Sequence, residues 1–166
     1  MSERRTPSQF ISDLLRAALT DPNAVRRALG TNWIYPDKPR LKALSGDKNN
    51  FPRLSITEID VGSEGDMGMA ATETYDKVLL SVTAWCYGDD LHSITVGSND
   101  AKVCSGHNLA EAIIQNTHIW LRENWRDQTV LMDYEKSGTS PYLEDFGGVI
   151  KKYTMTIKFK GVNIGD

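Results

Sequence analysis

The sequence lacks the features that mark several large classes of protein. None of its apolar runs approaches the roughly 20 residues that a membrane-spanning helix needs. Its first residues contain no apolar core of a secretory signal peptide. The formal net charge is only −3 over 166 residues, whereas proteins that bind nucleic acid nonspecifically usually carry a strong basic excess. We therefore expect no membrane partner and no general affinity for nucleic acid.

Cysteine and histidine are scarce, which limits the available chemistry. The two cysteines, Cys86 and Cys104, have no Cys-x-x-Cys partner, which predicts reduced thiols in a reducing cytoplasm. His107 and His118 are about three turns apart on a predicted helix, roughly 16 Å along its axis, so they cannot ligate one metal ion. The sequence predicts no catalytic, metal-binding or cofactor-binding residue.

Other chemical signals are equally weak. Gly62, Gly65 and Gly68 have no Gly-Lys-Ser/Thr ending and precede a strand, which excludes a phosphate-binding loop. The adjacent acids Asp89 and Asp90 follow a glycine and are typical of an exposed turn. The lysines of the last strand have no aromatic residues between them, which favours a solvated sheet face over a platform for single-stranded nucleic acid.

What the sequence does contain is a clear order of patterned segments. A capping box at Thr6-Pro7-Ser8-Gln9 starts a helix, and Asp21-Pro22 starts a short second helix that ends at Gly30. Together they predict N-terminal helices over 6–29. Residues 31–52 have no regular pattern but contain aromatic residues and prolines, which predicts an extended arm.

The first strands are predicted from the alternation of apolar and polar residues. In the strand from Arg53 to Val61 the apolar residues change parity, which predicts a bulge or an edge twist. A glycine-rich excursion over 62–72 leads to a long strand from Glu73 to Tyr87. The segment from His92 to Val96 is either a short strand or a loop.

The second half of the chain predicts the main helix and two more strands. Ser98-Asn99-Asp100 offers caps for the helix, which extends to about Trp125. Its predicted buried stripe is Val103, Leu109, Ala110, Ile113, Thr117, Trp120 and Leu121. A third strand covers 129–134, followed by a connection through Gly138, Pro141, Gly147 and Gly148. In the last strand one face is apolar and the other polar, with Tyr153, Met155, Ile157 and Phe159 on the apolar face.

The predicted fold class is α+β. It consists of a single, mostly antiparallel sheet of about four strands, with helices packed on one face and long loops between the elements. Residues 1–166 form a single domain, in which the sheet and the main helix cover 53–160.

Three stretches of this pattern resemble the tail-terminator and tail-completion proteins of tailed viruses. In Phe51-Pro52-Arg53-Leu54-Ser55-Ile56 a proline starts the first strand after a long loop. The long second strand ends at Trp85-Cys86-Tyr87, and the closing strand contains Tyr153-Thr154-Met155-Thr156-Ile157-Lys158-Phe159. The likeness covers most of the chain as a pattern of elements and contains no single diagnostic motif.

The resemblance implies a structural function without an active site. Proteins of this family form rings, commonly hexameric, that cap the tail tube, stop its polymerisation and join it to the head connector while DNA passes through the lumen. The implied partners are further copies of the chain, the major tail (tube) protein and head–tail connector proteins. The implied location is the tail or neck of the virion, after assembly in the host cytoplasm.

The residues predicted to contact other subunits lie in the loops and on the long strand. Aromatic residues, methionine and arginine are enriched at protein interfaces, and the candidates are Trp33, Tyr35, Arg40, Met67, Met69 and Trp85. Alternatively, these side chains fix each loop to its own domain.

Three other functions stay open. One is a different head–tail neck protein, such as an adaptor or a stopper. Another is a small enzyme with an intersubunit site built on Asp89, Asp90 and His92. The last is a monomeric ligand-binding module.

Overall fold

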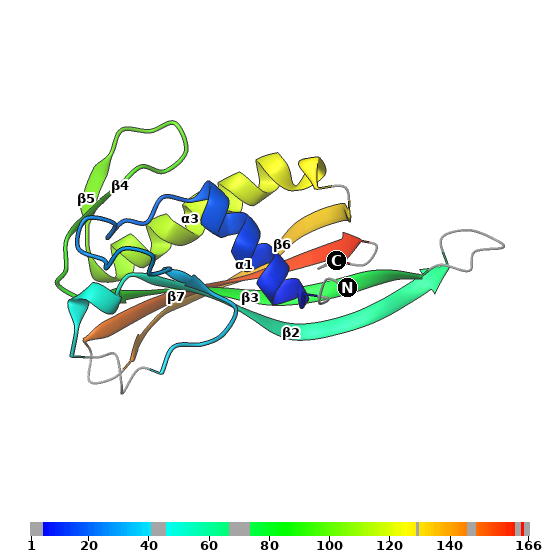
Figure 1. Cartoon of the computed structure of the whole chain (residues 1–166), viewed down its shortest axis with the longest axis horizontal. Helices are drawn as coiled ribbons and strands as arrows, with labels where there is room; N and C mark the ends of the chain where they lie inside the picture. The colour runs from blue at the N-terminus through cyan, green and yellow to red at the C-terminus, as the bar shows by residue number, and fades with distance from the viewer. Residues whose placement is uncertain are drawn as a thin grey trace.

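The computed structural model describes residues 5–40, 46–66, 74–128, 130–145, 149–161 and 164 of the chain. Its main layer is a five-stranded sheet in the order β1-β2-β3-β7-β6. Two helices, α1 (Pro7–Ala18) and α3 (Gly106–Asn124), cover one face of this sheet (Figure 1). The predicted α+β class with helices on one face is confirmed.

The sheet is mixed, because its first strand runs parallel to the second. The strands β2 (Arg53–Asp66), β3 (Thr74–Tyr87), β7 (Ile150–Gly161) and β6 (Leu131–Asp145) pair antiparallel with their neighbours. By contrast, β1 (Ile34–Tyr35) pairs parallel with the start of β2. The prediction missed β1, which lies within the predicted arm, because a strand of 2 residues is too short to show alternation.

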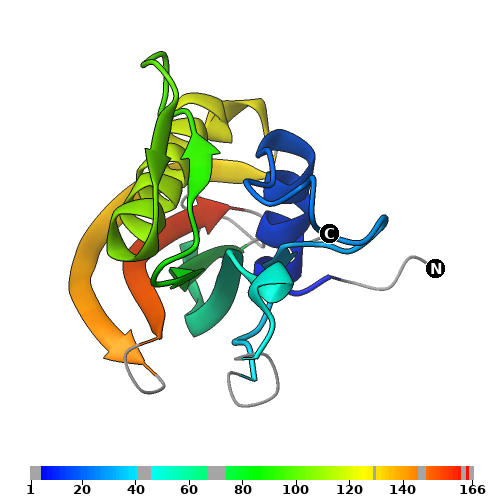
Figure 2. The ribbon, with the colours of Figure 1, turned by 90° about the vertical axis from the view of Figure 1, so that its left-hand side faces the viewer.

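A second, smaller sheet projects from the body of the molecule. It is a hairpin of β4 (His92–Ile94) and β5 (Lys102–Cys104), and it reaches beyond α3 in Figure 2. The segment that was predicted as either a strand or a loop is therefore a short strand. Two short 3-10 turns, Lys48–Asn50 and Trp125–Asp127, complete the regular structure of the described ranges.

The hydrophobic core lies between the helices and one face of the sheet. The alternation predicted for β7 is confirmed, since Met155, Ile157 and Phe159 are fully buried while Thr156 and Lys158 between them are half-exposed. Side chains of both helices complete the same core, including Ile11, Leu15, Leu109, Ile113 and Leu121.

The helix α1 begins where its capping box predicts. Thr6 Oγ1 accepts a hydrogen bond from the Gln9 amide (3.3 Å), and Gln9 Oε1 accepts one from the Thr6 amide (3.0 Å). The Glu58 carboxylate of β2 accepts bonds from both the amide and the hydroxyl of Ser8 (3.2 and 3.1 Å). A negative charge at this end of a helix is favourable because the helix dipole is positive there. The cap therefore also fixes α1 to the sheet.

The prediction of a second helix over 21–29 is wrong. Residues 22–26 form consecutive turns, and the Asn23 amide donates to Asp21 Oδ1 (2.8 Å). Such bonds from side chain to backbone compete with helix formation. Val25 and Leu29, which the helix would have buried, are fully exposed.

The main helix begins later than its predicted caps. Residues 98–100 lie in the turn between β4 and β5, and Val103 is 68% exposed in β5 instead of buried. The helix starts at Gly106, where φ is +55°, and a Cβ atom there would lie 2.9 Å from the carbonyl oxygen of Gly88. Glycine therefore allows the start of α3 to contact the end of β3. Within the described ranges, no helix combines the length and the apolar character needed to cross a bilayer.

The strands β2 and β6 are longer than predicted. The predicted bulge in β2 is confirmed by a register shift between Glu58 and Asp60, but the strand continues to Asp66. In β6, Gly138 and Pro141 belong to the strand and not to a connection. Proline is tolerated there because β6 is an edge strand. The rest of the predicted excursion, residues 67–72, and the glycines at 147–148 lie outside the described residues.

Candidate functional site

Two of the predicted interface residues are buried inside the subunit. Trp33 and Trp85 are each 6% exposed. Trp33 packs in the main core, whereas Trp85 packs with Phe51 and Ile150 in a small separate cluster. The indole Nε1 of Trp85 also donates to the hydroxyl oxygen of Ser55 (3.0 Å). In the single subunit both tryptophans hold their own domain together, which is the alternative that the sequence left open.

The other predicted interface residues differ in their surroundings. Tyr35 is half-buried, with the Arg53 guanidinium 4.0 Å from its ring centroid, and its hydroxyl donates to the Asn32 carbonyl oxygen (2.6 Å). Arg40 is exposed in the segment that follows β1. Met67 and Met69 lie outside the described residues. Among the predicted interface residues that the structure describes, Arg40 is exposed to solvent.

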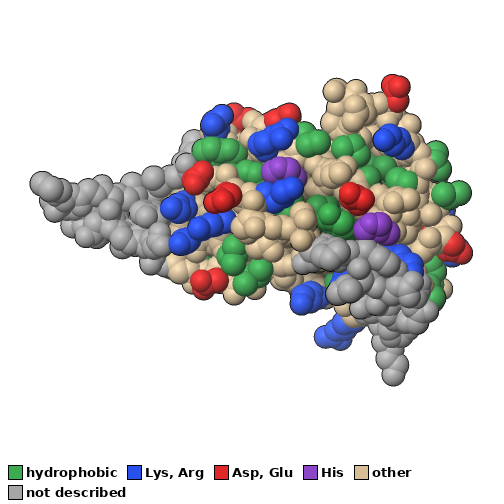
Figure 3. Space-filling model, turned by 180° about the vertical axis from the view of Figure 1, so that it is seen from behind, with side chains coloured by type: hydrophobic (Ala, Val, Ile, Leu, Met, Phe, Trp, Pro, Cys, Tyr) green, Lys and Arg blue, Asp and Glu red, His purple; other side chains and the backbone are tan. Residues whose placement is uncertain are grey.

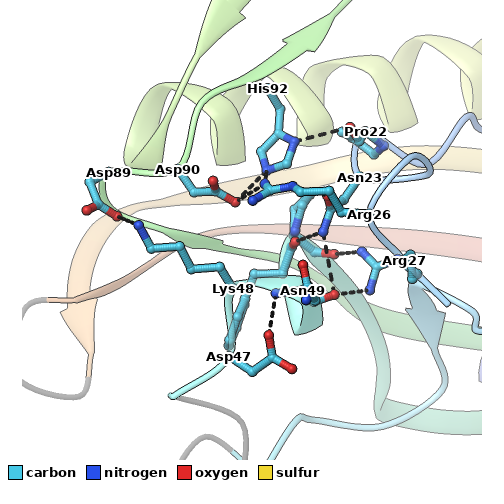
Figure 4. A network of polar contacts seen from close by, with 12 residues as sticks. Pro22, Asn23, Arg26, Arg27, Asp47, Lys48, Asn49, Asp89, Asp90 and His92 are labelled. Atoms are coloured by element: carbon cyan, nitrogen blue, oxygen red, sulfur yellow. Dashed lines mark hydrogen bonds and ion pairs between the residues drawn. The ribbon is translucent and has the colours of Figure 1, made fainter.

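A polar network joins the turns after α1 to the segment that follows β3 (Figure 4). Arg26 Nη2 donates to Asp90 Oδ2 (2.6 Å), and His92 Nε2 lies 2.7 Å from the same oxygen. His92 Nδ1 lies 3.1 Å from the carbonyl oxygen of Pro22. Both partners of the ring only accept, so both contacts are hydrogen bonds when each ring nitrogen carries a proton. The Asp90 and His92 side chains are 11% and 5% exposed.

The contacts of the Asp90 side chain favour its charged form. Burial alone raises the pKa of this carboxyl group, because it removes water from the charged form. The hydrogen bonds and positive charges of His92 and Arg26 outweigh burial and hold the pKa below its ordinary value. The ionised carboxylate is therefore the form that the network stabilises.

Neighbouring side chains fix the same turns to the start of β2. Arg27 Nε donates to Asp21 Oδ2 (2.5 Å), and Arg27 Nη2 donates to the carbonyl oxygen of Pro52 (2.8 Å). The buried Asn23 side chain donates to the carbonyl oxygen of Phe51 (2.8 Å). Hydrogen bonds to backbone groups that are distant in sequence therefore stabilise these turns, where the sequence predicted a helix.

The geometry of this network is that of a structural clamp. The polar atoms of Asp90 and His92 contact other groups of the protein. A hollow of about 610 Å³ lies nearby and is lined by Asp21, Pro22 and Ser93, but neither Asp90 nor His92 lines it. Across the described ranges, no three His, Cys, Asp or Glu side chains are grouped to hold a metal ion. The hydrogen bonds and ion pairs of the network hold three segments together, namely the turns after α1, the segment that follows β3 and the start of β2.

Besides Val25 and Leu29 after α1 and the less exposed Val149, exposed apolar side chains lie on β2 and at the β4–β5 hairpin. On β2, Ile59 and Val61 are 54% and 48% exposed. At the β4–β5 hairpin, Leu91 and Val103 are 64% and 68% exposed. Exposed apolar groups on an edge strand favour contact with another chain, so these surfaces are candidate sites of assembly.

Surface charge on the rear face of the molecule is mixed. In Figure 3, Lys and Arg side chains alternate with Asp and Glu, and the described part of that face shows no continuous basic patch. A protein that binds nucleic acid through its phosphates usually carries such a patch. The mixed surface agrees with the small net charge of the chain.

The two thiols differ in access, which predicts the order of their modification. Cys86 is fully buried, and burial raises the pKa of its thiol well above the ordinary value. Cys104 is partly exposed, although burial also raises the pKa of its thiol.

We expect a thiol-specific chromogenic disulfide reagent to label Cys104 slowly in the folded protein and Cys86 only on unfolding, because only an accessible thiolate reacts. The variant Cys104→Ser should lose the native-state reaction, and equal labelling rates for both thiols would contradict the structure.

No protein-family model matches the chain, and no curated protein matches it either. The function must therefore be inferred from the fold, the exposed surfaces and the pattern of elements. On the part of the chain that the structure describes, exposed apolar groups lie at the outer edge of β2 and at the β4–β5 hairpin, as well as in the turns after α1.

Proposed function

We propose that this protein is a structural virion protein that forms a ring at the head-proximal end of a viral tail tube. There it terminates tail polymerisation and joins the tail to the head. The order of the long elements supports this reading, since α1, β2, β3, α3, β6 and β7 follow one another as in the pattern that resembles tail-terminator proteins.

The observation that carries the proposal is the open edge of the sheet at β2. The short strand β1 pairs only with Leu54 and Ser55, and farther along β2 the side chains of Ile59 and Val61 are about half exposed. A long strand with an open edge and exposed apolar groups is suited to contact with another chain. It lies apart from other exposed surfaces of the subunit, among them the projecting β4–β5 hairpin (Figure 1). Head-to-tail contacts between unlike surfaces close into rings when the rotation between copies allows it.

The partners follow from this role. We infer a ring of six copies, with the major tail protein on one side and the head–tail connector proteins on the other. DNA passes through the lumen without specific binding. The net charge of −3 supports this, because a strongly basic lumen would retain the phosphate backbone. The proposed location is the neck or tail of the virion, after assembly in the host cytoplasm.

Light scattering and tube growth test the proposal together. We expect the purified protein at micromolar concentration to have a mass several times that of the chain. We also expect it to stop the elongation of tubes formed by the major tail protein of the same virus. The double variant Ile59→Ser/Val61→Ser should weaken both effects without loss of the fold, because these side chains are exposed. A wild-type protein that stays monomeric and leaves tube length unchanged would overturn the proposal.

A further inference from the structure

Among the described residues, the outer edge of β2 has no paired strand over most of its length. β1 covers it only at Leu54 and Ser55, and no other described strand pairs with that side. The register shift between Glu58 and Asp60 leaves Ile59 as the extra residue of a bulge. Residues 58–62 are all exposed. A bulge turns side chains out of the regular pleat, so this stretch presents both apolar and charged groups to solvent.

The charge on this edge has a single sign. Residues 54–62 contain no lysine or arginine, and the acidic residues among them are Glu58 and Asp60. Glu58 already accepts two hydrogen bonds from Ser8 at the start of α1. Asp60 is exposed between Ile59 and Val61. A surface that binds here must therefore bring positive charge together with apolar contact.

The opposite edge of the sheet, the strand β6, does not supply that positive charge. On β6 the exposed residues Asp133 and Glu135 are acidic and only Lys136 beside them is basic. Like charges that face each other across a strand pair are destabilising. Direct pairing of β2 with β6 of a second copy, or of β2 with another β2, is therefore disfavoured.

The segment that follows β1 has the complementary character. Lys38 and Arg40 are both exposed there beside the exposed Asp37, so the segment over 36–40 carries a net positive charge. It leaves the sheet after Tyr35, which pairs with Ser55, whereas Asp60 lies roughly 15 Å farther along β2. In Figure 1 the light-blue trace after β1 runs toward the end of the sheet where β7 begins, away from the open stretch of β2.

We infer that the open edge of β2 around Asp60 binds the Lys38–Arg40 segment of a second copy of this chain. The acidic edge and the basic segment are different surfaces of one subunit, so the contact is head-to-tail. Ile59 and Val61 add apolar area beside the ion pairs. The inference rests on the proposed ring and names the surfaces that would join its subunits.

Charge reversal on each surface tests this contact. We expect Asp60→Lys alone and Arg40→Glu alone to raise the apparent dissociation constant of self-association at least tenfold, measured by analytical ultracentrifugation at low salt. The double variant Asp60→Lys/Arg40→Glu should recover assembly, because each contact regains opposite charges. An equimolar mixture of the two single variants should also assemble, with the two chains alternating. Glu135→Lys on β6 makes the same change of charge on the other edge and should leave assembly unchanged.

Three results overturn the inference. The first is wild-type affinity in both single variants, which would leave the proposed ring intact but built through other surfaces. The second is loss of assembly in the single variants with no recovery in the double variant or in the mixture. The third is a wild-type chain that does not associate and does not affect tube growth, which would overturn the proposed function as well. Circular dichroism on each variant confirms that the fold is retained.

Discussion

Replacing Gly161 with alanine should destabilise the protein more than any other small substitution in the sheet. Gly161 ends β7 and pairs with Asp76 of β3 and Leu131 of β6. A Cβ atom at this position would overlap the carbonyl oxygen of Val130 and lie 2.9 Å from Cγ1 of Ile164. Backbone atoms cannot yield as a flexible side chain can, so the chain at the start of β6 must move away from β7. We expect the free energy of unfolding to fall by at least about 3 kcal/mol.

A matched glycine in the same sheet provides the control. Gly138 lies within β6, and a Cβ atom there would meet nothing within 4 Å. Gly138→Ala should leave the stability unchanged or raise it by up to about 1 kcal/mol, because alanine restricts the unfolded chain. Urea unfolding followed by circular dichroism compares the two variants. Equal midpoints would mean that β6 does not approach Gly161 as closely as the structure shows.

The elements that could be predicted from sequence are those whose burial imposes a period on the chain. A half-buried face imposes strict alternation on β7, and the capping box of α1 lies entirely within Thr6–Gln9. Such local signals specify an element without knowledge of its neighbours. The two-residue β1 and the three-residue β4 and β5 have no such signal. Only their tertiary contacts, such as the full burial of Ile34, define them.

The segment after α1 shows how a local signal can predict the wrong structure. Asp21-Pro22 suits the start of a helix and also the start of a turn. The turn is stabilised by Asn23, whose side chain donates a hydrogen bond to the carbonyl oxygen of Phe51, 28 residues away. No pattern within the segment contains that information.

The candidate site was predictable only in part, for the same reason. Asp90 and His92 are close enough in sequence to suggest a shared site, but their partner Arg26 is 64 residues from Asp90. The two tryptophans were predicted from residue type, which does not distinguish an interface from a core. The open edge of β2 depends on how far β1 extends along it, and this follows from the three-dimensional fold alone.

The second large effect is expected at Asp90, where Asp90→Asn should weaken the clamp between the turns and the sheet. The substitution removes the charge that pairs with Arg26 (2.6 Å) and contacts His92 (2.7 Å) in a site where the carboxylate is 11% exposed. Removal of one partner from a buried ion pair costs 3–5 kcal/mol, but Arg26 is 43% exposed, so we expect about 2 kcal/mol at neutral pH. The exposed neighbour Asp89, which pairs with Lys48 at 3.1 Å, is the control, and Asp89→Asn should cost less than about 0.5 kcal/mol.

The pH dependence distinguishes a lost charge from a change of shape. The pKa of Asp90 is below 3.8 in the folded protein, so its contribution is complete above the pKa of the unfolded chain and is lost as pH falls through the lower folded value. The stability difference between wild type and Asp90→Asn should therefore shrink below about pH 4. Urea unfolding at a series of pH values measures this difference. A gap that stayed the same in acid would show that the amide disturbs the packing of the turns, and that the charge of Asp90 does not hold the clamp.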